Sequence, residues 1–362
     1  MIPITGYLQT YDWGVRGGLN PWLPSPAGEG PQAELWFGAH PNGPSPLRDE
    51  PGTLADATRP GEVSLLVKLL AAARPLSIQL HPPAELAAAL FADGSDLVAD
   101  DGAKIEMLVA LEPFAVFAGW RDPEHAARLL EAADPDLVGA ADDVRAERPQ
   151  LALPKVLAVG PERVGVGISL VLEAASELGL DTYETASLAL AAREFPGDPG
   201  LFVLLLLAHR RLEAGAAVYI PAGGVHAYAE GFGIEIMTSS DNVLRLGLTG
   251  KRIAVAEAIE ALRDEGEPHF LGADVQMDHG HPVMTSYRPY SAPFAAEFLR
   301  SSSLVARTGG YRCVVCIAGE TTIICGDEAL TLQQGQGCAI LTDEPDAHIE
   351  ADGSAAVVET RG

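Results

Sequence analysis

The sequence is poor in basic residues. Its 362 residues include 24 Lys and Arg against 50 Asp and Glu, so the formal net charge at pH 7 is −26. A chain this acidic repels other polyanions, which argues against nucleic acid or an anionic membrane surface as its partner. An anionic small-molecule substrate remains compatible with this charge, but its site must be a local basic or metal-bearing exception.

Long hydrophobic runs are also absent. The longest aliphatic run, residues 201–208, is too short to span a bilayer and predicts a buried helix. The first residues (MIPITG) lack the basic start and the apolar stretch of a secretory signal. We therefore expect a soluble, cytoplasmic protein.

Cysteine is scarce and confined to the last fifty residues, at Cys313, Cys316, Cys325 and Cys338. Cys313 and Cys316 have the spacing of a redox motif, but the Val- and Ile-rich residues around them are typical of a strand. In a strand, side chains three residues apart point to opposite faces. The pattern therefore favours buried free thiols over a redox pair.

Segments typical of β-structure flank a block with helical periodicity. Residues 1–62 are rich in Gly and Pro, and alternation typical of strands begins at Val63. Strands return from residue 217, and the segment from residue 267 onward has the short strands and Gly-rich turns of a sandwich or jelly roll. The fold class is thus mainly β with an inserted helical domain. Helices are predicted over residues 83–91, 122–133, 171–178, 182–194, 200–213 and 251–263.

One predicted strand carries polar side chains that need a cavity. In residues 74–83 (RPLSIQLHPP), the two-residue period places Ser77, Gln79 and His81 on one face and three apolar residues on the other. Because buried polar groups without partners are costly, the polar face must meet a cavity, solvent or a ligand. A half-exposed antiparallel strand has the same alternation, so this stretch alone leaves both interpretations open.

A second polar cluster, from Gly215 to His226, has the spacing Gly-x5-Pro-x-Gly-x2-His. Its glycines and proline make a tight turn that aims His226 into a cavity. This spacing resembles the second metal motif of the cupin superfamily, and Gln79, His81 and Glu106 would supply the first. Two imidazoles, one carboxylate and one amide oxygen suit zinc or a similar divalent ion, with an open position for a water or substrate oxygen.

An ordered set of further motifs resembles the type I phosphomannose isomerase family. The matching segments extend over about two-thirds of the chain: YDWG at 11–14, AELWFGAHP at 33–41, SIQLHP at 77–82, KIE at 104–106, YIPAGGVHAY at 219–228 and SDNVLRLGLTGK at 240–251. The resemblance implies two cupin-type jelly rolls and one helical domain. The catalytic cupin would comprise residues 1–120 and 213–262, the helical insert residues 121–212, and a cupin-like β domain without metal residues 263–362.

The resemblance also implies an activity and a set of site residues. The activity is the reversible isomerisation of mannose 6-phosphate and fructose 6-phosphate by a monomer that holds one zinc ion or another divalent metal. It implies that the metal ligands are Gln79, His81, Glu106 and His226, that Arg245 is catalytic, and that Ser77, Lys104, Glu235 and Lys251 are substrate-binding positions.

These residue types suit an isomerisation through a cis-enediol. A base moves a proton between C2 and C1 while charge builds on O1 and O2, and a divalent metal can stabilise that charge. Arg245 can hold the enediolate or orient the sugar. Lys104, Lys251 and Ser77 are candidates to hold the phosphate. The base remains open among a metal-bound hydroxide, Lys104 and Glu235.

The chain departs from the family pattern just before the third ligand. Residues 101–106 (DGAKIE) lack the Asn-His and the Pro of the family's NHKPE segment, although Lys104 and Glu106 stay in register. The residues after His81-Pro82 differ as well. The ligand is therefore retained, while the loop shape and the substrate preference are open.

Two other classes of protein share parts of this pattern. A non-catalytic cupin that binds a sugar phosphate, as a sensor or storage module, would not need Arg245 or Lys251. An iron- and dioxygen-dependent cupin oxidoreductase usually relies on a His-rich triad, which Gln79 does not match. We expect the His-x-His segment at residues 279–281 to lie in a surface loop, and we expect His348 to have a structural role.

Overall fold

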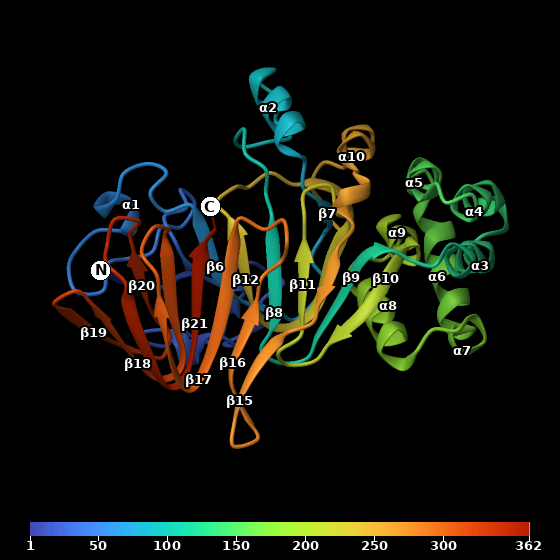
Figure 1. Cartoon of the computed structure of the whole chain (residues 1–362). Coiled ribbons are helices and arrows are strands. Elements are labelled where there is room, and N and C mark those ends of the chain that lie inside the picture. The colour runs from blue at the N-terminus through green and yellow to red at the C-terminus, as the bar shows by residue number, and fades with distance from the viewer. Residues whose placement is uncertain (362) are drawn as a thin grey trace.

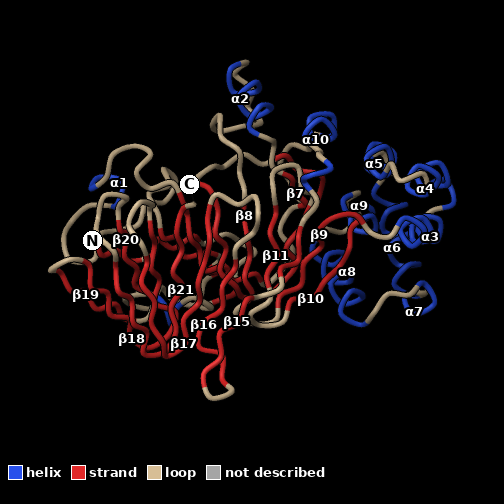
Figure 2. The backbone as a smooth tube through the Cα atoms, viewed as in Figure 1, coloured by secondary structure: helices blue, strands red, loops and turns tan. Residues whose placement is uncertain are grey.

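Two antiparallel β-sheets and a block of helices make up the protein. The computed structural model describes residues 1–361, the side chain of residue 264 excepted. Figure 1 shows the two sheets side by side, with the C-terminal sheet at one end of the molecule and the helical block at the other. Figure 2 shows the same separation of strands from helices. This architecture confirms the predicted fold class, mainly β with inserted helices.

The larger sheet holds the strands that carry the candidate site. Its long central strand, β12, pairs with β6 and β8, and its first residues pair with β7 and β9. The eleven strands are β2 (Tyr7–Gln9), β5 (Glu34–Phe37), β6 (Leu65–Ala72), β7 (Ile78–Leu80), β8 (Glu106–Ala110), β9 (Phe114–Trp120), β10 (Leu207–Leu212), β11 (Ala217–Ile220), β12 (His226–Thr238), β13 (Leu244–Gly247) and β14 (His269–Leu271).

The second sheet contains the C-terminal strands and one strand from the N-terminus. β1 pairs with β20, so residues 2–5 lie in the C-terminal sheet. The domain limits given above stay a prediction. The eight strands are β1 (Ile2–Thr5), β15 (Asp274–Asp278), β16 (His281–Tyr287), β17 (Phe294–Ala306), β18 (Arg312–Cys325), β19 (Glu328–Gln333), β20 (Gln336–Ile340) and β21 (Ala347–Thr360); β3 (Val15–Arg16) and β4 (Pro31–Gln32) form a separate ribbon.

The inserted helices lie between strands β9 and β10 of the larger sheet. They are α3 (Pro123–Ala133), α4 (Val138–Arg145), α5 (Pro149–Leu157), α6 (Pro161–Glu173), α7 (Ala175–Leu178), α8 (Thr182–Glu194) and α9 (Gly200–Leu206). The remaining helices are α1 (Leu54–Ala57), α2 (Ala84–Ala92) and α10 (Val255–Ala261), with short 3-10 turns at Asn20–Trp22, Pro135–Leu137 and Asp264–Gly266.

The predicted helix over residues 200–213 is only half right. The chain is helical to Leu206 and then becomes strand β10, which pairs with β9. The aliphatic run has no polar face to mark a period, since every residue of α9 is buried. Pairing with β9, which is about ninety residues away in sequence, therefore decides where the helix ends.

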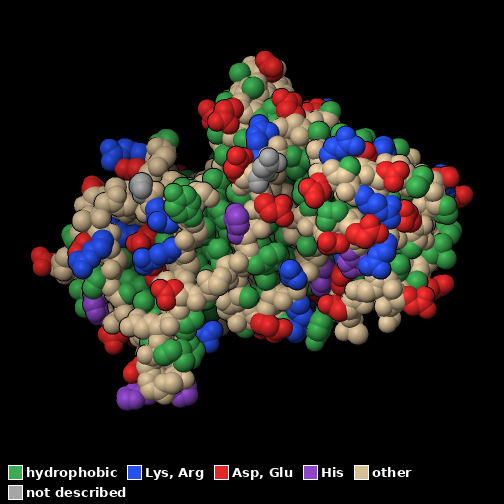
Figure 3. Space-filling view, turned by 45° about the vertical axis from the view of Figure 1, so that its right-hand side comes forward, with side chains coloured by type: hydrophobic (Ala, Val, Ile, Leu, Met, Phe, Trp, Pro, Cys, Tyr) green, Lys and Arg blue, Asp and Glu red, His purple; other side chains and the backbone are tan. Residues whose placement is uncertain are grey.

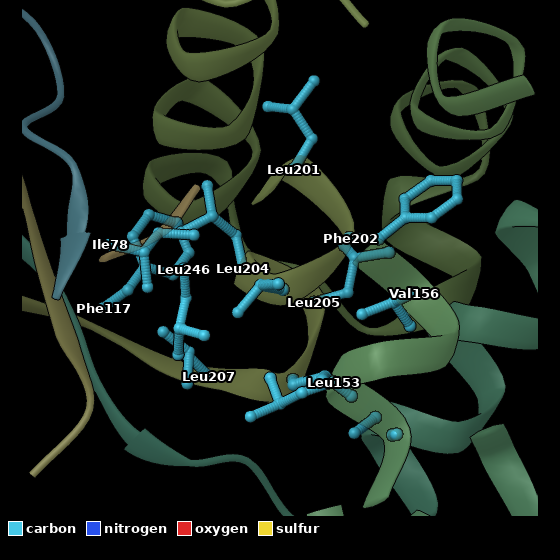
Figure 4. Packing of buried hydrophobic residues seen from close by; sticks show 14 of the residues in the cluster. Ile78, Phe117, Leu153, Val156, Leu201, Phe202, Leu204, Leu205, Leu207 and Leu246 are labelled. Atoms are coloured by element: carbon cyan, nitrogen blue, oxygen red, sulfur yellow. The ribbon is translucent and has the colours of Figure 1, made fainter. Parts of the chain in front are cut away.

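The largest hydrophobic core joins the helical block to the site-bearing strands. Ile78 of β7, Phe117 of β9 and Leu246 of β13 pack in one cluster with Leu204 and Leu205 of α9 (Figure 4). Each of these five side chains is at most 1% exposed. A fully buried side chain of this size contributes about 1.5–3 kcal/mol relative to exposure. The helices therefore stabilise the strands from which the site is built.

A pair of glycines brings helix α9 against strand β13. A Cβ on Gly247 would lie 2.4 Å from the Cα of Gly200, and Gly247 has a φ of +148°, which L side chains rarely adopt. The Asp198 carboxylate accepts hydrogen bonds from the backbone N–H of Gly200 at 2.7 Å and of Thr249 at 3.3 Å. These contacts fix the loop that follows Arg245.

The loop around residues 279–281 lies at the surface, as predicted. His279 lies in the turn between β15 and β16, with its side chain 93% exposed, which confirms a surface loop there. Figure 3 shows His side chains at the tip of this hairpin, and Lys, Arg, Asp and Glu mixed over the rest of that face.

Within residues 1–361, no helix is both long enough and apolar enough to cross a lipid bilayer.

All four cysteines are free and buried, as predicted. Cys313 packs in the core between the two sheets, whereas Cys316 packs in a separate cluster on the other face of the C-terminal sheet. Burial raises the pKa of Cys313 and of Cys338 to about 12. Neither thiol therefore forms a reactive thiolate near neutral pH.

We predict that the native protein resists thiol reagents. At pH 8, Cys313 and Cys338 should not react measurably with iodoacetamide over an hour, because the reagent needs an accessible thiolate. Mass spectrometry should find all four sites alkylated after unfolding in guanidinium. Rapid alkylation of Cys313 without denaturant would contradict the buried environment.

Candidate metal centre

Three buried side chains meet at the ends of neighbouring strands. His81 follows β7, Glu106 begins β8 and His226 begins β12. One ligand atom from each lies within 4.8 Å of the other two, and no second such group of His, Cys, Asp or Glu occurs in the described part of the chain. β12 pairs with β7 at His226, and Glu106 pairs with Ile220 of β11, which directly precedes the turn to His226. These two pairings bring the three residues together. Their role as metal ligands stays a prediction.

The turn before β12 places His226 opposite His81. The backbone N–H of Gly223 donates to the carbonyl of His81 at 2.7 Å. Gly223 has a φ of +86°, and a Cβ there would lie 2.9 Å from the carbonyl oxygen of Ala261. The turn therefore requires glycine at this position, as the Pro-x-Gly spacing predicted.

Backbone carbonyls fix the orientation of both imidazoles. Nδ1 of His81 lies 2.9 Å from the carbonyl oxygen of Asn242, and Nδ1 of His226 lies 3.1 Å from that of Gly224. A carbonyl only accepts hydrogen bonds, so each Nδ1 carries the proton and each Nε2 keeps its lone pair. Both Nε2 atoms face Glu106. Nε2 of His81 lies 3.2 Å from Oε2 of Glu106, and Nε2 of His226 lies 2.9 Å from Oε1.

This arrangement fits a divalent cation. Among the described residues, Nε2 of His81 and Oε2 of Glu106 are buried without a hydrogen-bond partner, although Nζ of Lys104 lies 2.8 Å from that oxygen as an ion pair. Buried polar atoms without partners are costly. Two imidazole lone pairs and a carboxylate are ligands that zinc and similar ions take. A bound ion would thus give Nε2 of His81 the partner that it lacks, and it would be a second cationic partner for Oε2 of Glu106.

The electrostatics keep two of the candidate ligands, Glu106 and His81, deprotonated. Burial by itself would raise the pKa of Glu106, but Lys104 and the two imidazoles outweigh it and hold that pKa well below its usual range. Burial and the charge of Lys104 lower the pKa of His81 to about 4. Tyr228 also donates a hydrogen bond to Oε1 of Glu106 at 3.1 Å. Metal ligands must be deprotonated, so both shifts favour metal binding at neutral pH.

A cavity of about 730 Å³ adjoins the cluster. Gln79 connects the two, because it lines the cavity and is paired with His226 across strands β7 and β12. Its other neighbour is Arg245 on β13. Four of the predicted site residues line this cavity: Ser77, Gln79, Arg245 and Lys251.

The predicted residue Glu235 belongs to a buried network that the sequence analysis missed. Its carboxylate lies 2.8 Å from Nζ of Lys68, and Glu34 lies 3.6 Å from the same nitrogen. Trp36 donates to Glu34 at 2.8 Å, and Lys68 lies 5.2 Å from the Trp36 ring. Lys68 is the one charged residue in β6 (LLVKLLAA), and this isolated charge in an apolar strand was the available signal.

Asn242 is a second residue that the sequence analysis did not single out. Its side chain is fully buried, and its Oδ1 accepts from the N–H of Ala99 at 2.7 Å. Its Nδ2 donates to the carbonyl oxygens of Asp100 and Gly102, both at 2.8 Å. Because its own carbonyl orients His81, Asn242 ties the loop before Lys104 to the cluster.

The fold and this cluster together define a β protein with a candidate metal centre. Residues 1–123 match the family model of the phosphomannose isomerase type I catalytic domain. A probable mannose-6-phosphate isomerase of Echinococcus multilocularis is 32% identical over 307 residues, 70% of each chain. The mannose-6-phosphate isomerase of Escherichia coli K12 is 27% identical over 390 residues, 99% of each chain.

Solved structures agree with these relatives. The crystal structure of mannose 6-phosphate isomerase from Salmonella typhimurium bound to fructose 6-phosphate and zinc covers 100% of both chains, with 26% identity and a TM-score of 0.83. The chain therefore belongs to the type I phosphomannose isomerase family, which confirms the resemblance found in the sequence motifs.

We predict that Asn242→Asp weakens metal binding. The new carboxylate can still accept from Ala99, but it loses the donors to Asp100 and Gly102 and repels the Asp100 carboxylate, which lies 3.1 Å from Nδ2 of Asn242. Support of this kind is worth about 10–100-fold in metal affinity. Competition between the protein and a zinc chelator would measure the change.

A matched control is Asn42→Asp. This exposed amide also donates to an aspartate, Asp241, at 2.7 Å, but it does not contact the His–Glu–His cluster. Its substitution should leave zinc affinity unchanged within about twofold. Equal zinc affinities of the two variants would show that Asn242 does not support the cluster.

Proposed function

We propose that the protein interconverts mannose 6-phosphate and fructose 6-phosphate with one bound zinc ion. The observation that carries the proposal is the His81–Glu106–His226 cluster, in which Nε2 of His81 has no hydrogen-bond partner. It lies next to a cavity whose lining includes the cations Arg245 and Lys251. The Salmonella typhimurium relative that binds fructose 6-phosphate and zinc supports it. Gln79, which borders both the cluster and the cavity, would complete the ligand set.

The cations of the cavity divide into paired and unpaired groups. Lys68 is paired with Glu235 and Glu34. By contrast, Arg245 and Lys251 line the cavity with no carboxylate within 4.0 Å among the described residues. Unpaired cations in a partly enclosed site attract an anionic ligand, even in a protein with a net charge of −26. We therefore assign the phosphate to Lys251 and Ser77.

Arg245 is placed to stabilise the reacting part of the sugar. It is the strand neighbour of Gln79, which adjoins the cluster. Burial lowers the pKa of Arg245, but a guanidinium stays protonated under all ordinary conditions. A fixed positive charge in a partly dry site stabilises the enediolate more than it would in water. When bound, the metal supplies further Lewis-acid stabilisation of the sugar oxygens.

Glu235 is better suited than Lys104 to transfer the proton. Burial raises the pKa of Glu235, although Lys68 acts in the opposite direction. A carboxylate with a raised pKa is a stronger base, and its catalytic efficiency increases as that pKa approaches the working pH. Each of the two side chains forms an ion pair at 2.8 Å, Lys104 with Glu106 and Glu235 with Lys68, so the raised pKa of Glu235 is what distinguishes them. Of the two side chains, we therefore propose Glu235 as the base.

We predict that the isomerase activity depends on the metal. Zinc-loaded protein should convert mannose 6-phosphate to fructose 6-phosphate in a coupled assay, and removal of the metal by a chelator should abolish turnover. Addition of zinc should restore it. Zinc-loaded protein that binds the sugar phosphate without converting it would instead favour a non-catalytic sensor or storage protein.

We also predict that Arg245→Ala lowers kcat by about 10²–10³-fold, the effect typical of a lost charge-stabilising donor. Zinc content, measured by elemental analysis, should not change. Arg252→Ala is the control, since Arg252 is exposed and pairs with Asp96 at 2.7 Å. Loss of zinc from the Arg245 variant would mean that Arg245 positions Gln79 rather than the substrate.

A further inference from the structure

The helical insert contributes part of the cavity wall. Glu194, the last residue of α8, and Phe195 both line the cavity. Facing them is Arg74, which precedes β7 and also lines the cavity. Nη1 of Arg74 donates to Oε2 of Glu194 at 3.2 Å. One ion pair therefore joins the insert to the sheet at the cavity surface.

This ion pair is open to exchange. The Arg74 side chain is 37% exposed and that of Glu194 is 20% exposed, so water screens their attraction. Glu194 also accepts a hydrogen bond from Arg193 at 3.0 Å, so its carboxylate keeps a cationic partner if Arg74 leaves. Release of Arg74 thus leaves no uncompensated charge on Glu194.

The backbone on either side of Arg74 is fixed. The N–H of Ala73 donates to the carbonyl of Trp13, and the N–H of Leu76 donates to the carbonyl of Tyr228, both at 2.9 Å. The side chain of Arg74 can therefore change partner by rotation about its own bonds, without movement of the strand that leads to Ser77. Ser77 and Lys251, the proposed phosphate groups, line the same cavity.

We propose that Arg74 is a specificity-determining residue that exchanges Glu194 for the phosphate of the substrate. This inference rests on the proposed function. A guanidinium binds a phosphate with two parallel hydrogen bonds, whereas its single bond to Glu194 is at 3.2 Å. A dianionic phosphate competes with Glu194 for Arg74, but the hydroxyl of a neutral sugar does not. Arg74 thereby favours phosphorylated ligands, and Glu194 holds its guanidinium at the cavity wall until a phosphate replaces it.

The test compares Arg74→Gln, Glu194→Gln and the control Arg59→Gln in the zinc-loaded protein. Loss of one charge-assisted contact should raise the KM for mannose 6-phosphate about tenfold in Arg74→Gln. Its kcat should stay within about twofold, because Arg74 does not contact the reacting carbons. Glu194→Gln should lower KM about threefold, since the competitor of the phosphate is gone. Arg59 also pairs with a glutamate, Glu62, but it is 84% exposed and does not line the cavity, so Arg59→Gln should match the wild type.

Competitive inhibition by inorganic phosphate separates this role from a structural one. Its inhibition constant should rise in Arg74→Gln and fall in Glu194→Gln, in parallel with KM, whereas a packing defect would lower the melting temperature and leave the constant unchanged. In the double variant, Glu194→Gln should have no effect on KM. An unchanged KM and phosphate inhibition constant in Arg74→Gln would overturn the inference.

Failure of the proposed function is distinguishable from failure of this inference. Zinc-loaded wild-type protein that does not convert mannose 6-phosphate would refute the isomerase. Calorimetric titration of inorganic phosphate into the same variants would then still measure the role of Arg74. Equal phosphate affinities of the wild type and Arg74→Gln would refute the exchange, whatever the activity.

Discussion

The structure depends on one buried carboxylate, that of Glu106, which is surrounded by two imidazoles and one ammonium group. A charge without access to water is costly unless its surroundings supply partners. Lys104 lies two residues before Glu106, whereas His81 and His226 come from distant parts of the sequence. The pairing of β7 with β12 and of β8 with β11 brings these two histidines to Glu106. The cluster can therefore form only if these strands pair in the correct register.

The cavity has a different charge balance from the chain as a whole. The chain has 50 acidic and 24 basic residues, whereas the cavity lining has four of each: Lys68, Arg74, Arg245 and Lys251 against Asp12, Glu34, Glu194 and Asp241. The four cations differ in how many carboxylates they are paired with. Lys68 is neutralised by two buried carboxylates, and Arg74 is held by one partly exposed carboxylate. Arg245 and Lys251 line the cavity without such a partner in the described chain. The positive charge that the cavity offers to a ligand therefore lies at Arg245 and Lys251.

The sequence was informative where function depends on short-range spacing. The alternation around Gln79 and His81 and the turn before His226 predicted which side chains share a cavity, because strand pleat and turn geometry are local. The network of Lys68 was not predictable in this way. It arises because Trp36 and Glu235 lie beside Lys68 on the two neighbouring strands, and such long-range register has no local signature. The early end of helix α9 was missed for the same reason.

The shared core of the helical insert and the sheet has a consequence for cooperativity. Ile78 and Leu246 flank the strand positions of Gln79 and Arg245, and both pack against leucines that belong to α9. An insert that unfolded alone would expose these strands to water on that face. The insert is therefore not an independent module that could be removed or exchanged while the centre stays intact. We therefore expect unfolding of the insert and release of a bound ion to occur together.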